Sequence, residues 1–185
     1  NVNVARVPAP AAAHPLLALI GNTPLLSFPH LEQDVPGVRL FAKAEWFNPG
    51  GSVKDRAAAS IIADAEASGR LPAPHGSRQA GLRDGAILLD ATSGNTGVAY
   101  AMIAAAKGYR ATLCVPKNAN PQVLALLSAY GADVVFTDPL QGSDGAIREA
   151  KRLAAEFPDT FVYLDQYNNP ANWQAHYHTT AVEIW

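Results

Sequence analysis

A lysine follows a glycine-rich turn in the first third of the chain. The stretch reads Lys43-Ala44-Glu45-Trp46-Phe47-Asn48-Pro49-Gly50-Gly51-Ser52-Val53-Lys54-Asp55-Arg56. The two adjacent glycines allow the backbone to turn sharply and to approach a ligand closely. Lys54 falls at the start of a predicted helix, where the positive end of the helix dipole disfavours a cation and makes the neutral amine more accessible. Because a Schiff base forms from a neutral amine, Lys54 is a candidate for covalent bonding to a carbonyl compound.

Two other interpretations of this lysine must be weighed. Most lysines of a globular protein are solvated surface residues, so Lys54 alone indicates little. The segment also has some likeness to a nucleotide phosphate loop. That motif requires Ser or Thr directly after its lysine, whereas Asp55 follows here, so the phosphate-loop interpretation does not fit.

A second polar turn leads from a predicted strand into a predicted helix. It reads Leu89-Asp90-Ala91-Thr92-Ser93-Gly94-Asn95-Thr96-Gly97. Free backbone N–H groups at such a helix start, together with hydroxyls from Thr92, Ser93 and Thr96, predict a carboxylate or phosphate site. Asn95 adds a side-chain amide that can donate to an oxygen. In isolation, the same residues also make an ordinary helix-capping turn.

The elements that must position these turns alternate between strand and helix. Short β-rich runs cover residues 39–45, 86–90, 110–115, 133–136 and 160–164, and apolar residues at helical spacing lie between them. This alternation predicts an α/β fold with a parallel sheet covered on both faces. In such sheets, ligands bind where strands end and helices begin. Residues 72–84 interrupt the pattern and are predicted to form an exposed loop.

The composition is that of a globular protein. The 185 residues are 49% hydrophobic and 16% charged, which predicts one domain, or one domain and the start of another. A net charge of -2 argues against nucleic acid or an anionic membrane as the main partner. The single cysteine, Cys114, makes the cytoplasm the expected compartment. The chain starts without Met and stops inside a helical stretch at Trp185, which favours a fragment or a trimmed chain.

Together, and in this order, the two turns resemble the cysteine synthase and cystathionine β-synthase family. This is the branch of pyridoxal-phosphate enzymes related to the tryptophan synthase β subunit. The likeness runs from residues 20–25 through residues 168–172 to Trp185, and covers only the N-terminal part of the family's length. It implies a parallel-sheet-based, three-layer αβα fold. Residues 1–165 would form the N-terminal α/β domain with the cofactor lysine, and residues 166–185 the start of a C-terminal domain.

The resemblance also implies roles by position. Lys54 matches the lysine that forms the Schiff base with pyridoxal 5'-phosphate and later moves a proton. Asn95 matches the residue that bonds the ring hydroxyl oxygen of the cofactor. The substrate carboxylate would be held by Thr92, Ser93, Thr96 and Gln166. No metal is required. In the family, a later Gly/Thr-rich loop holds the cofactor phosphate, and this sequence contains no second candidate for that loop.

The implied reaction is β-replacement on an activated serine such as O-acetylserine, with sulfide as the acceptor and cysteine as the product. The alternative within the family is cystathionine β-synthase, which would use serine and homocysteine with the same lysine. A different class is a truncated, non-catalytic chain or one half of a split assembly. A homodimer is the family expectation.

Other residues invite different interpretations. His176 and His178 could suggest a metal site, but residues two apart do not share a helix face. Cys114 lies in an apolar strand and is predicted to be a small buried hydrophobe. Trp46 and Phe47 are expected to pack beneath the lysine turn. Asp90, where Glu is commoner in the family, bears on the choice of substrate.

Overall fold

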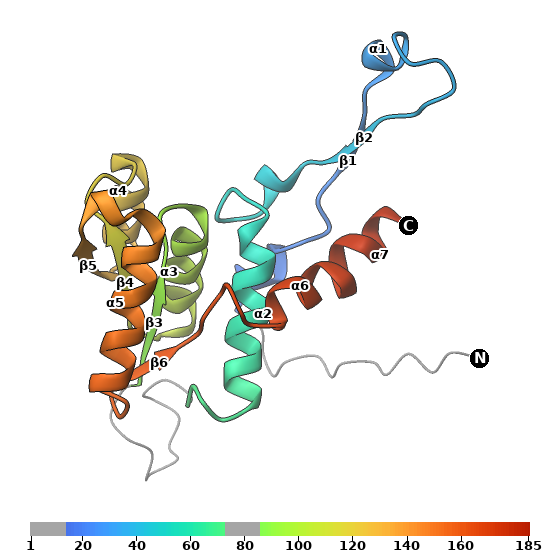
Figure 1. Cartoon of the computed structure of the whole chain (residues 1–185). Coiled ribbons are helices and arrows are strands. Elements are labelled where there is room, and N and C mark those ends of the chain that lie inside the picture. The colour runs from blue at the N-terminus through green and yellow to red at the C-terminus, as the bar shows by residue number, and fades with distance from the viewer. Residues whose placement is uncertain (1–13, 73–85) are drawn as a thin grey trace.

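A four-stranded parallel sheet forms the centre of the molecule, for which we describe residues 14–72 and 86–185 of a computed structural model (Figure 1). Its strands run in the order β5-β4-β3-β6. Their bounds are Ile87–Ala91 for β3, Ala111–Pro116 for β4, Asp133–Thr137 for β5 and Phe161–Tyr163 for β6. Every residue of β3 and β4 is buried, as the almost continuous apolar runs predict for strands covered on both faces.

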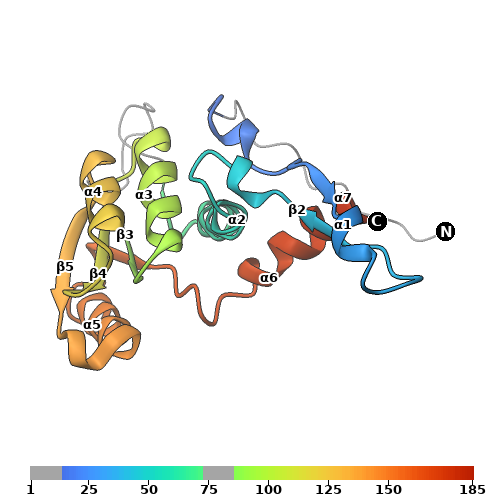
Figure 2. The ribbon, with the colours of Figure 1, turned by 90° about the horizontal axis from the view of Figure 1, so that it is seen from above.

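Helices cover both faces of this sheet (Figure 2). α3 (Asn95–Lys107) and α4 (Pro121–Ala129) cover one face, and α2 (Lys54–Ala67) packs against α3. α5 (Gly142–Glu156) lies on the opposite face. The predicted three-layer αβα architecture is therefore confirmed.

The helix ends follow the sequence signals. Gly69, Gly108 and Gly131 have φ values of 72°, 79° and 75°, the left-handed conformation expected just after a helix. Pro121 occupies the first turn of α4, and the side chain of Asn120 caps that helix by accepting from the N–H of Gln122 at 2.8 Å. These local stops fix the length of the helices and thereby the positions of the turns between them.

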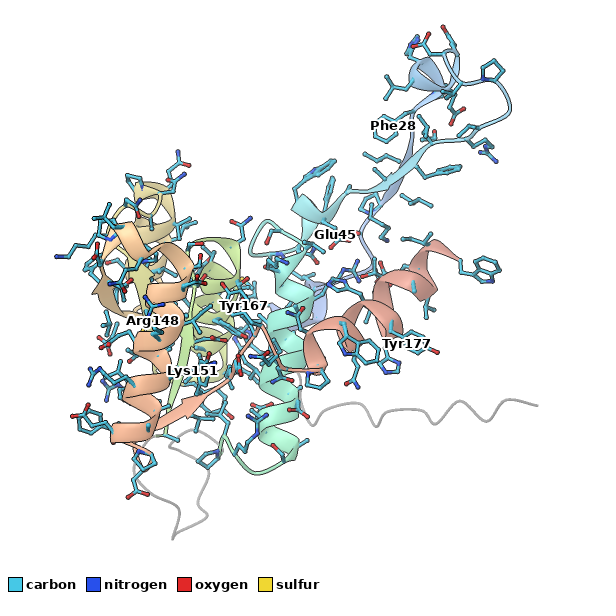
Figure 3. The ribbon with its side chains drawn as sticks, in the orientation of Figure 1. Phe28, Glu45, Arg148, Lys151, Tyr167 and Tyr177 are labelled. Carbon is cyan, nitrogen blue, oxygen red and sulfur yellow. The ribbon has the colours of Figure 1, made fainter. Side chains whose placement is uncertain are left out.

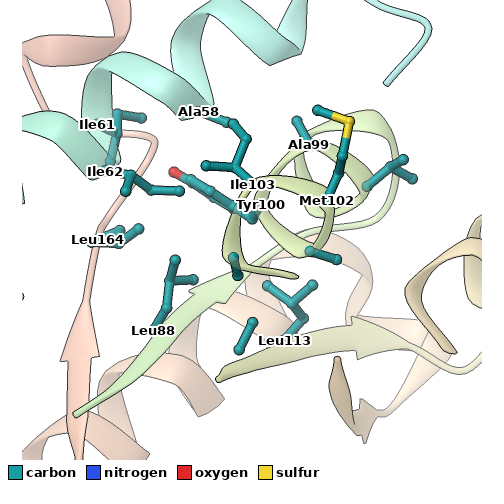
Figure 4. Packing of buried hydrophobic residues seen from close by; sticks show 14 of the residues in the cluster. Ala58, Ile61, Ile62, Leu88, Ala99, Tyr100, Met102, Ile103, Leu113 and Leu164 are labelled. Carbon is teal, nitrogen blue, oxygen red and sulfur yellow. The ribbon is translucent and has the colours of Figure 1, made fainter. Parts of the chain in front are cut away.

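The larger core lies between the sheet and the α2–α3 pair (Figure 4). Ile61 and Ile62 of α2 meet Tyr100 and Ile103 of α3 over Leu88 of β3, and all five are at most 1% exposed. Burial of this apolar area is the main favourable contribution to folding. It also fixes α2, and with it Lys54, relative to α3.

A separate two-stranded ribbon extends from the body in Figure 1. β1 (Leu25–Ser27) and β2 (Phe41–Lys43) pair antiparallel, and α1 (Pro29–Glu32) lies between them in the sequence. The strand predicted at residues 39–45 therefore exists in shortened form as β2. However, it does not join the parallel sheet, and its partner β1 was not predicted. The ribbon is joined to α2 through a 3-10 turn, Glu45–Phe47.

The expectation that Trp46 and Phe47 pack beneath the lysine turn is wrong. Both side chains are 61% exposed, and their rings face outward from the 3-10 turn with centroids 6.0 Å apart. The space inside the turn is taken by the buried carboxylate of Asp55, which accepts a hydrogen bond from the N–H of Gly50.

After β6 the chain crosses to α2. α6 (Ala171–Ala175) packs against α2, followed by a π-helical turn (His176–Thr180) and α7 (Ala181–Ile184). Short 3-10 turns also occur at Leu17–Leu19 and Pro139–Gln141. Apart from Pro72, the loop predicted at residues 72–84 lies outside the described residues. Among the described helices, none has the length and apolar character needed to span a membrane.

Candidate active site

Lys54 is the first residue of α2, as its place after the glycines predicts. Gly51 adopts a φ of 80°, so it provides the sharp reversal for which a glycine is needed. The N–H of Lys54 donates to the hydroxyl of Ser52 at 3.2 Å, which holds the backbone of the turn (residues 48–54, the lysine turn). The expected close approach at Gly50 is also present, but it is to Asp55: a Cβ atom at Gly50 would collide with that carboxylate.

Two lysines border this turn and differ in what surrounds their amines. Lys43 Nζ is buried, 2.6 Å from a carboxylate oxygen of Glu183 and 2.5 Å from the carbonyl of Thr23. Lys54 is exposed, and no described carboxylate pairs with its amine. The Lys43 amine is therefore already occupied by an ion pair and a hydrogen bond. Of these two lysines, Lys54 is the one whose amine no described carboxylate occupies.

A buried arginine anchors the start of α2. Arg56 donates to Glu45 at 2.9 Å and to Glu183 at 2.5 and 2.7 Å, and its side chain is 1% exposed. Figure 3 shows Glu45 at the junction between the ribbon and α2. Hydrogen bonds from Arg56 lower the pKa of Glu183 to about 2. Burial raises the pKa of Glu45, but hydrogen bonds from Arg56, Thr23 and Asn48 outweigh it, so that pKa is lowered.

Asp55, the residue after Lys54, is a second buried ionisable group at the start of α2. Its Oδ2 accepts from Gly50 N–H at 2.5 Å, while Oδ1 has no hydrogen-bond partner among the described residues. Burial raises the pKa of Asp55 to about 6, and the hydrogen bond from Gly50 opposes this rise. The side chains of Asp55 and Arg56 thus fix the lysine turn on its buried side, and the Lys54 side chain is exposed to solvent.

The second turn (residues 92–97, the Thr92 turn) is organised by Thr92. Its buried hydroxyl accepts from the N–H of Gly94 at 3.2 Å and from the N–H of Gly97 at 3.0 Å. A Cβ atom at Gly97 would collide with the Thr92 methyl group, so only glycine fits there. The alternative interpretation of this segment as a capping turn therefore holds for the Thr92 side chain, which stabilises the start of α3.

The backbone of the Thr92 turn nevertheless keeps donors free. None of the described residues accepts a hydrogen bond from the N–H groups of Ser93, Asn95 or Thr96. Ser93 and Asn95 are exposed, whereas Thr96 is 8% exposed. Unpaired N–H groups at the positive end of a helix favour an anion such as a carboxylate or phosphate.

Gln166 lies against the strand that precedes the Thr92 turn. Its Nε2 donates to the carbonyl of Ala91 at 2.6 Å, and its backbone N–H donates to Oδ2 of Asp90 at 3.1 Å. The side chain of Asn172 donates to its carbonyl at 2.8 Å. The second N–H of the Gln166 carboxamide has no described partner, so it can donate to a bound group.

The structure thus joins some of the predicted residues directly and others only through packing. Gln166 contacts Ala91, the neighbour of Thr92, so these segments form one unit. Lys54 is connected to this unit through the packing of α2 on α3, and no hydrogen bond or ion pair joins them among the described residues. The arrangement offers unpaired donors for an anion at the start of α3 and an exposed amine at the start of α2, the helix packed against it. It therefore suits an amino acid carboxylate and a carbonyl cofactor such as pyridoxal phosphate.

Two residues near these turns were not predicted as parts of the site. Asp90 was noted only as a departure from the family pattern, although it holds Gln166. His176 was weighed only as a metal ligand. It directly follows α6, the helix packed against α2, and burial together with the charges of Lys54 and Arg56 lowers the pKa of His176. Its Nδ1 lies 3.0 Å from Thr180 Oγ1. Neither residue carries a sequence signal, because both depend on contacts between distant segments.

Cys114 behaves as predicted. It is 0% exposed within β4, and burial raises the pKa of its thiol to about 12. A thiol with so high a pKa is a poor nucleophile, so Cys114 serves to pack the second core cluster under α5.

Comparison with proteins of known sequence identifies curated relatives of this chain. It is 46% identical over 176 residues to a cysteine synthase from Aquifex aeolicus, covering 94% of this chain and 50% of the relative. It is 41% identical over 176 residues to a cystathionine beta-synthase from Saccharomyces cerevisiae, covering 92% of this chain and 32% of the relative. The chain thus spans about half the length of the cysteine synthases it matches, or less of longer relatives.

Solved structures give the same fold. Cysteine synthase from Entamoeba histolytica superposes with a TM-score of 0.80 at 34% identity, covering 98% of this chain and 51% of that one. O-ureido-L-serine synthase superposes with a TM-score of 0.77 at 38% identity, covering 91% and 49%. The model of the family described as pyridoxal-phosphate dependent enzyme matches residues 16–185. With the fold, the two turns and these relatives in agreement, the chain belongs to the pyridoxal-phosphate-dependent enzyme family that includes the cysteine synthases and cystathionine β-synthases.

Proposed function

We propose that the complete protein joins sulfide to an activated serine, such as O-acetylserine, to give cysteine by β-replacement. The observation that carries this proposal is the free Lys54 amine on α2, the helix packed against α3, whose first N–H groups are unpaired. Bound pyridoxal phosphate would supply an electron sink for the reaction. The residues of this chain would bind it, orient the substrate and move a proton.

Each predicted site residue then has one task. Lys54 would hold the cofactor and move the proton of the substrate α-carbon. The N–H groups of Ser93, Asn95 and Thr96, with the free carboxamide N–H of Gln166, would hold the substrate carboxylate. The Asn95 side chain, exposed at the start of α3, would bond the ring hydroxyl oxygen of the cofactor. The Thr92 hydroxyl would contribute by shaping the turn and, on rearrangement, by donating to the carboxylate.

Rigidity is the second support for this assignment. The substrate carboxylate would be fixed by backbone groups, which the Thr92 hydroxyl and the Ala91–Gln166 contact keep in place. A carboxylate fixed at one end of the substrate restricts the direction of the α-carbon–hydrogen bond. Preorganisation of this kind is a large part of what a protein adds to the reactivity of a cofactor.

The choice of acceptor is the finer part of the proposal. Named relatives include cysteine synthases, cystathionine beta-synthases and an O-ureido-L-serine synthase, so the shared half of the chain is compatible with more than one nucleophile. Feeding the complete protein sulfide or homocysteine with serine or O-acetylserine separates the alternatives. We expect cysteine from O-acetylserine and sulfide. If cystathionine were the only product, the proposal of a cysteine synthase would be wrong and the protein would act as a cystathionine β-synthase. No product with any pair would favour the non-catalytic class.

Lys54 can be tested by spectroscopy and chemical trapping. The complete protein should show the visible absorption of bound cofactor, and borohydride reduction should fix the cofactor to Lys54. Lys54→Ala should remove both signals. The matched control is Lys117→Ala, an exposed lysine at the end of β4, which should leave them unchanged. Cofactor recovered on Lys43 or Lys117 would overturn the assignment.

The family resemblance supports three further predictions. The complete protein is expected to be a homodimer, which sedimentation of the purified protein can check; the cytoplasmic location expected from the single cysteine is a separate proposal. It is expected to need no metal, so chelation should leave its activity intact. The division at residue 165 between an N-terminal domain and the start of a C-terminal domain is also proposed.

A further inference from the structure

The buried carboxyl group of Asp90 closes a ring of hydrogen bonds beneath the candidate site. Asp90 is 0% exposed and precedes the last residue of β3. Its Oδ1 accepts from the N–H of Ala91 at 2.8 Å, and its Oδ2 accepts from the N–H of Gln166 at 3.1 Å. The Gln166 side chain returns to the carbonyl of Ala91 at 2.6 Å. Asp90 therefore joins the strand end before the Thr92 turn to the backbone of Gln166.

A tyrosine from α3 completes this cluster. Tyr100 is 0% exposed, and Figure 4 shows it in the core beside α2. Its hydroxyl faces Asp90 but has no hydrogen bond of good geometry with a described residue. Other ionisable groups that face Asp90 from the elements around it are Tyr163, Asp165, Tyr167 and Cys114. These neighbours are neutral or negative at neutral pH, so they provide no ion pair for the carboxylate.

We propose that Asp90 is a positioning residue, whose ionised carboxylate holds Gln166 against the end of β3 and so orients its carboxamide beside the start of α3. The two N–H donors reach separate oxygens, and an ionised carboxylate can accept on both. A neutral acid carries an O–H on one oxygen and accepts poorly there. Protonation therefore weakens one of the two bonds, and the longer one, to Gln166, is the one to be lost.

Burial acts against ionisation at this place. It raises the pKa of Asp90 to about 7 from an ordinary value of 3.8, although the hydrogen bonds from Ala91 and Gln166 oppose this rise. Because the folded protein binds the proton more tightly than the unfolded chain, the contribution of Asp90 to stability falls as the pH rises from about 4 to about 7. Gln166, in contrast, becomes better held as the pH rises through 7. As the pH rises, Gln166 is therefore held more firmly while the contribution of Asp90 to the stability of the fold decreases.

The backbone amides of Gln166 and Ala91 report this directly. In the complete protein labelled with 15N-glutamine and 15N-alanine, both signals should shift together with a midpoint near pH 7. In Asp90→Asn the Gln166 signal should be independent of pH and lie near its low-pH position in the native protein. Asp133→Asn is the matched control, since Asp133 is an exposed aspartate of the same sheet paired with Arg110. It should leave the Gln166 titration unchanged.

Asp90→Asn should also reduce the fall of unfolding free energy between pH 4 and 7, because its amide does not titrate, while Asp55 continues to contribute. A Gln166 amide that does not respond between pH 5 and 9, or that responds equally in Asp90→Asn, would overturn the proposal.

The consequence for catalysis rests on the proposed function. In Asp90→Asn, the KM for the amino acid substrate should rise roughly tenfold, the effect of one well-placed hydrogen bond, while kcat and the cofactor absorption change little. A purely structural role would instead reduce stability and cofactor content together. If the protein makes no cysteine, the proposed function fails, but the amide titration still tests whether Asp90 holds Gln166.

Discussion

The starts of α2 and α3 are both short polar turns with glycines, yet they use their hydrogen-bonding groups in different ways. At α2, the charged groups of Asp55 and Arg56 are buried and turned inward, where Arg56 pairs with Glu183 from the far end of the chain. At α3, one local hydroxyl, that of Thr92, organises the turn, and several backbone donors stay free. The start of α2 is thus stabilised by a residue far away in the sequence, Glu183, whereas the start of α3 is stabilised by Thr92 within the same turn.

This difference indicates how a helix start can be both stable and able to bind. A turn whose donors are all satisfied internally has nothing to offer a ligand. The Thr92 turn satisfies two N–H groups with one hydroxyl and leaves its neighbours unpaired, so it keeps its shape while remaining an anion site. The lysine turn has the opposite requirement. There the side chain of Lys54 must stay free, so the buried charges below it need partners of their own.

The largest expected effect is loss of the arginine that anchors α2. Arg56→Ala leaves Glu45 and Glu183 without their cation, so we expect the free energy of unfolding to fall by about 3–5 kcal/mol. Urea unfolding of the native protein and the variant measures this difference in free energy. Arg152→Ala is the control, because Arg152 also bonds two glutamates, Glu149 and Glu156, but on an exposed face of α5. A similar loss in both variants would show that burial is not what makes the anchor of α2 important.

A smaller effect is expected from crowding the Thr92 turn. Gly97→Ala places a methyl group against the Thr92 methyl, and overpacking of this kind costs about 1–3 kcal/mol. Adding Thr92→Ser to the Gly97→Ala variant removes the obstructing methyl group and should recover part of the lost stability. Gly94→Ala tests the same turn where nothing lies within 4 Å of the added atom. Thermal unfolding of the native protein, Gly97→Ala, the Gly97→Ala/Thr92→Ser double variant and Gly94→Ala measures these losses. A lower unfolding temperature for Gly94→Ala than for Gly97→Ala would contradict this account.

The smallest expected effect comes from removing only the hydroxyl that caps the turn. Thr92→Val keeps the shape of the side chain but leaves the N–H of Gly94 without a described acceptor and the N–H of Gly97 with only the carbonyl of Gly94, at a cost of about 1 kcal/mol. Thr137→Val is matched to it, since the Thr137 hydroxyl is also buried but has no described partner. Chemical unfolding should show a loss for Thr92→Val and none for Thr137→Val. Equal losses would mean that the hydroxyl does not organise the start of α3.

Much of the fold was predictable because its signals are local. Continuous apolar runs located β3, β4, β5 and β6 to within a residue or two, and glycines marked the ends of helices. The antiparallel pairing of β2 was missed because β1 has only three residues, Leu25–Ser27, too few to show a periodic pattern. A run of β-forming residues also does not reveal which strand it will join.

The candidate site divides in the same way. The candidate lysine, Lys54, and the Thr92 turn lie in contiguous segments with recognisable residue types, so the sequence alone could propose them. The holding of Gln166 by Asp90 joins residues 76 positions apart. No local pattern encodes such a contact, and an aspartate inside an apolar strand does not show whether its partner is water, a cation or a backbone N–H.

The ion pair between Arg56 and Glu183 determines when, during synthesis of the chain, the start of α2 can be completed. Residues 127 positions apart must meet before the start of α2 is complete. At a synthesis rate of roughly 5–20 residues per second, Glu183 follows Arg56 out of the ribosomal active centre after roughly 6–25 seconds. During that interval the emerging chain carries the apolar stripe of α2 and an arginine that has only one of its two carboxylate partners in the described structure, Glu45. The lysine turn is therefore among the last parts of this chain to reach its final form.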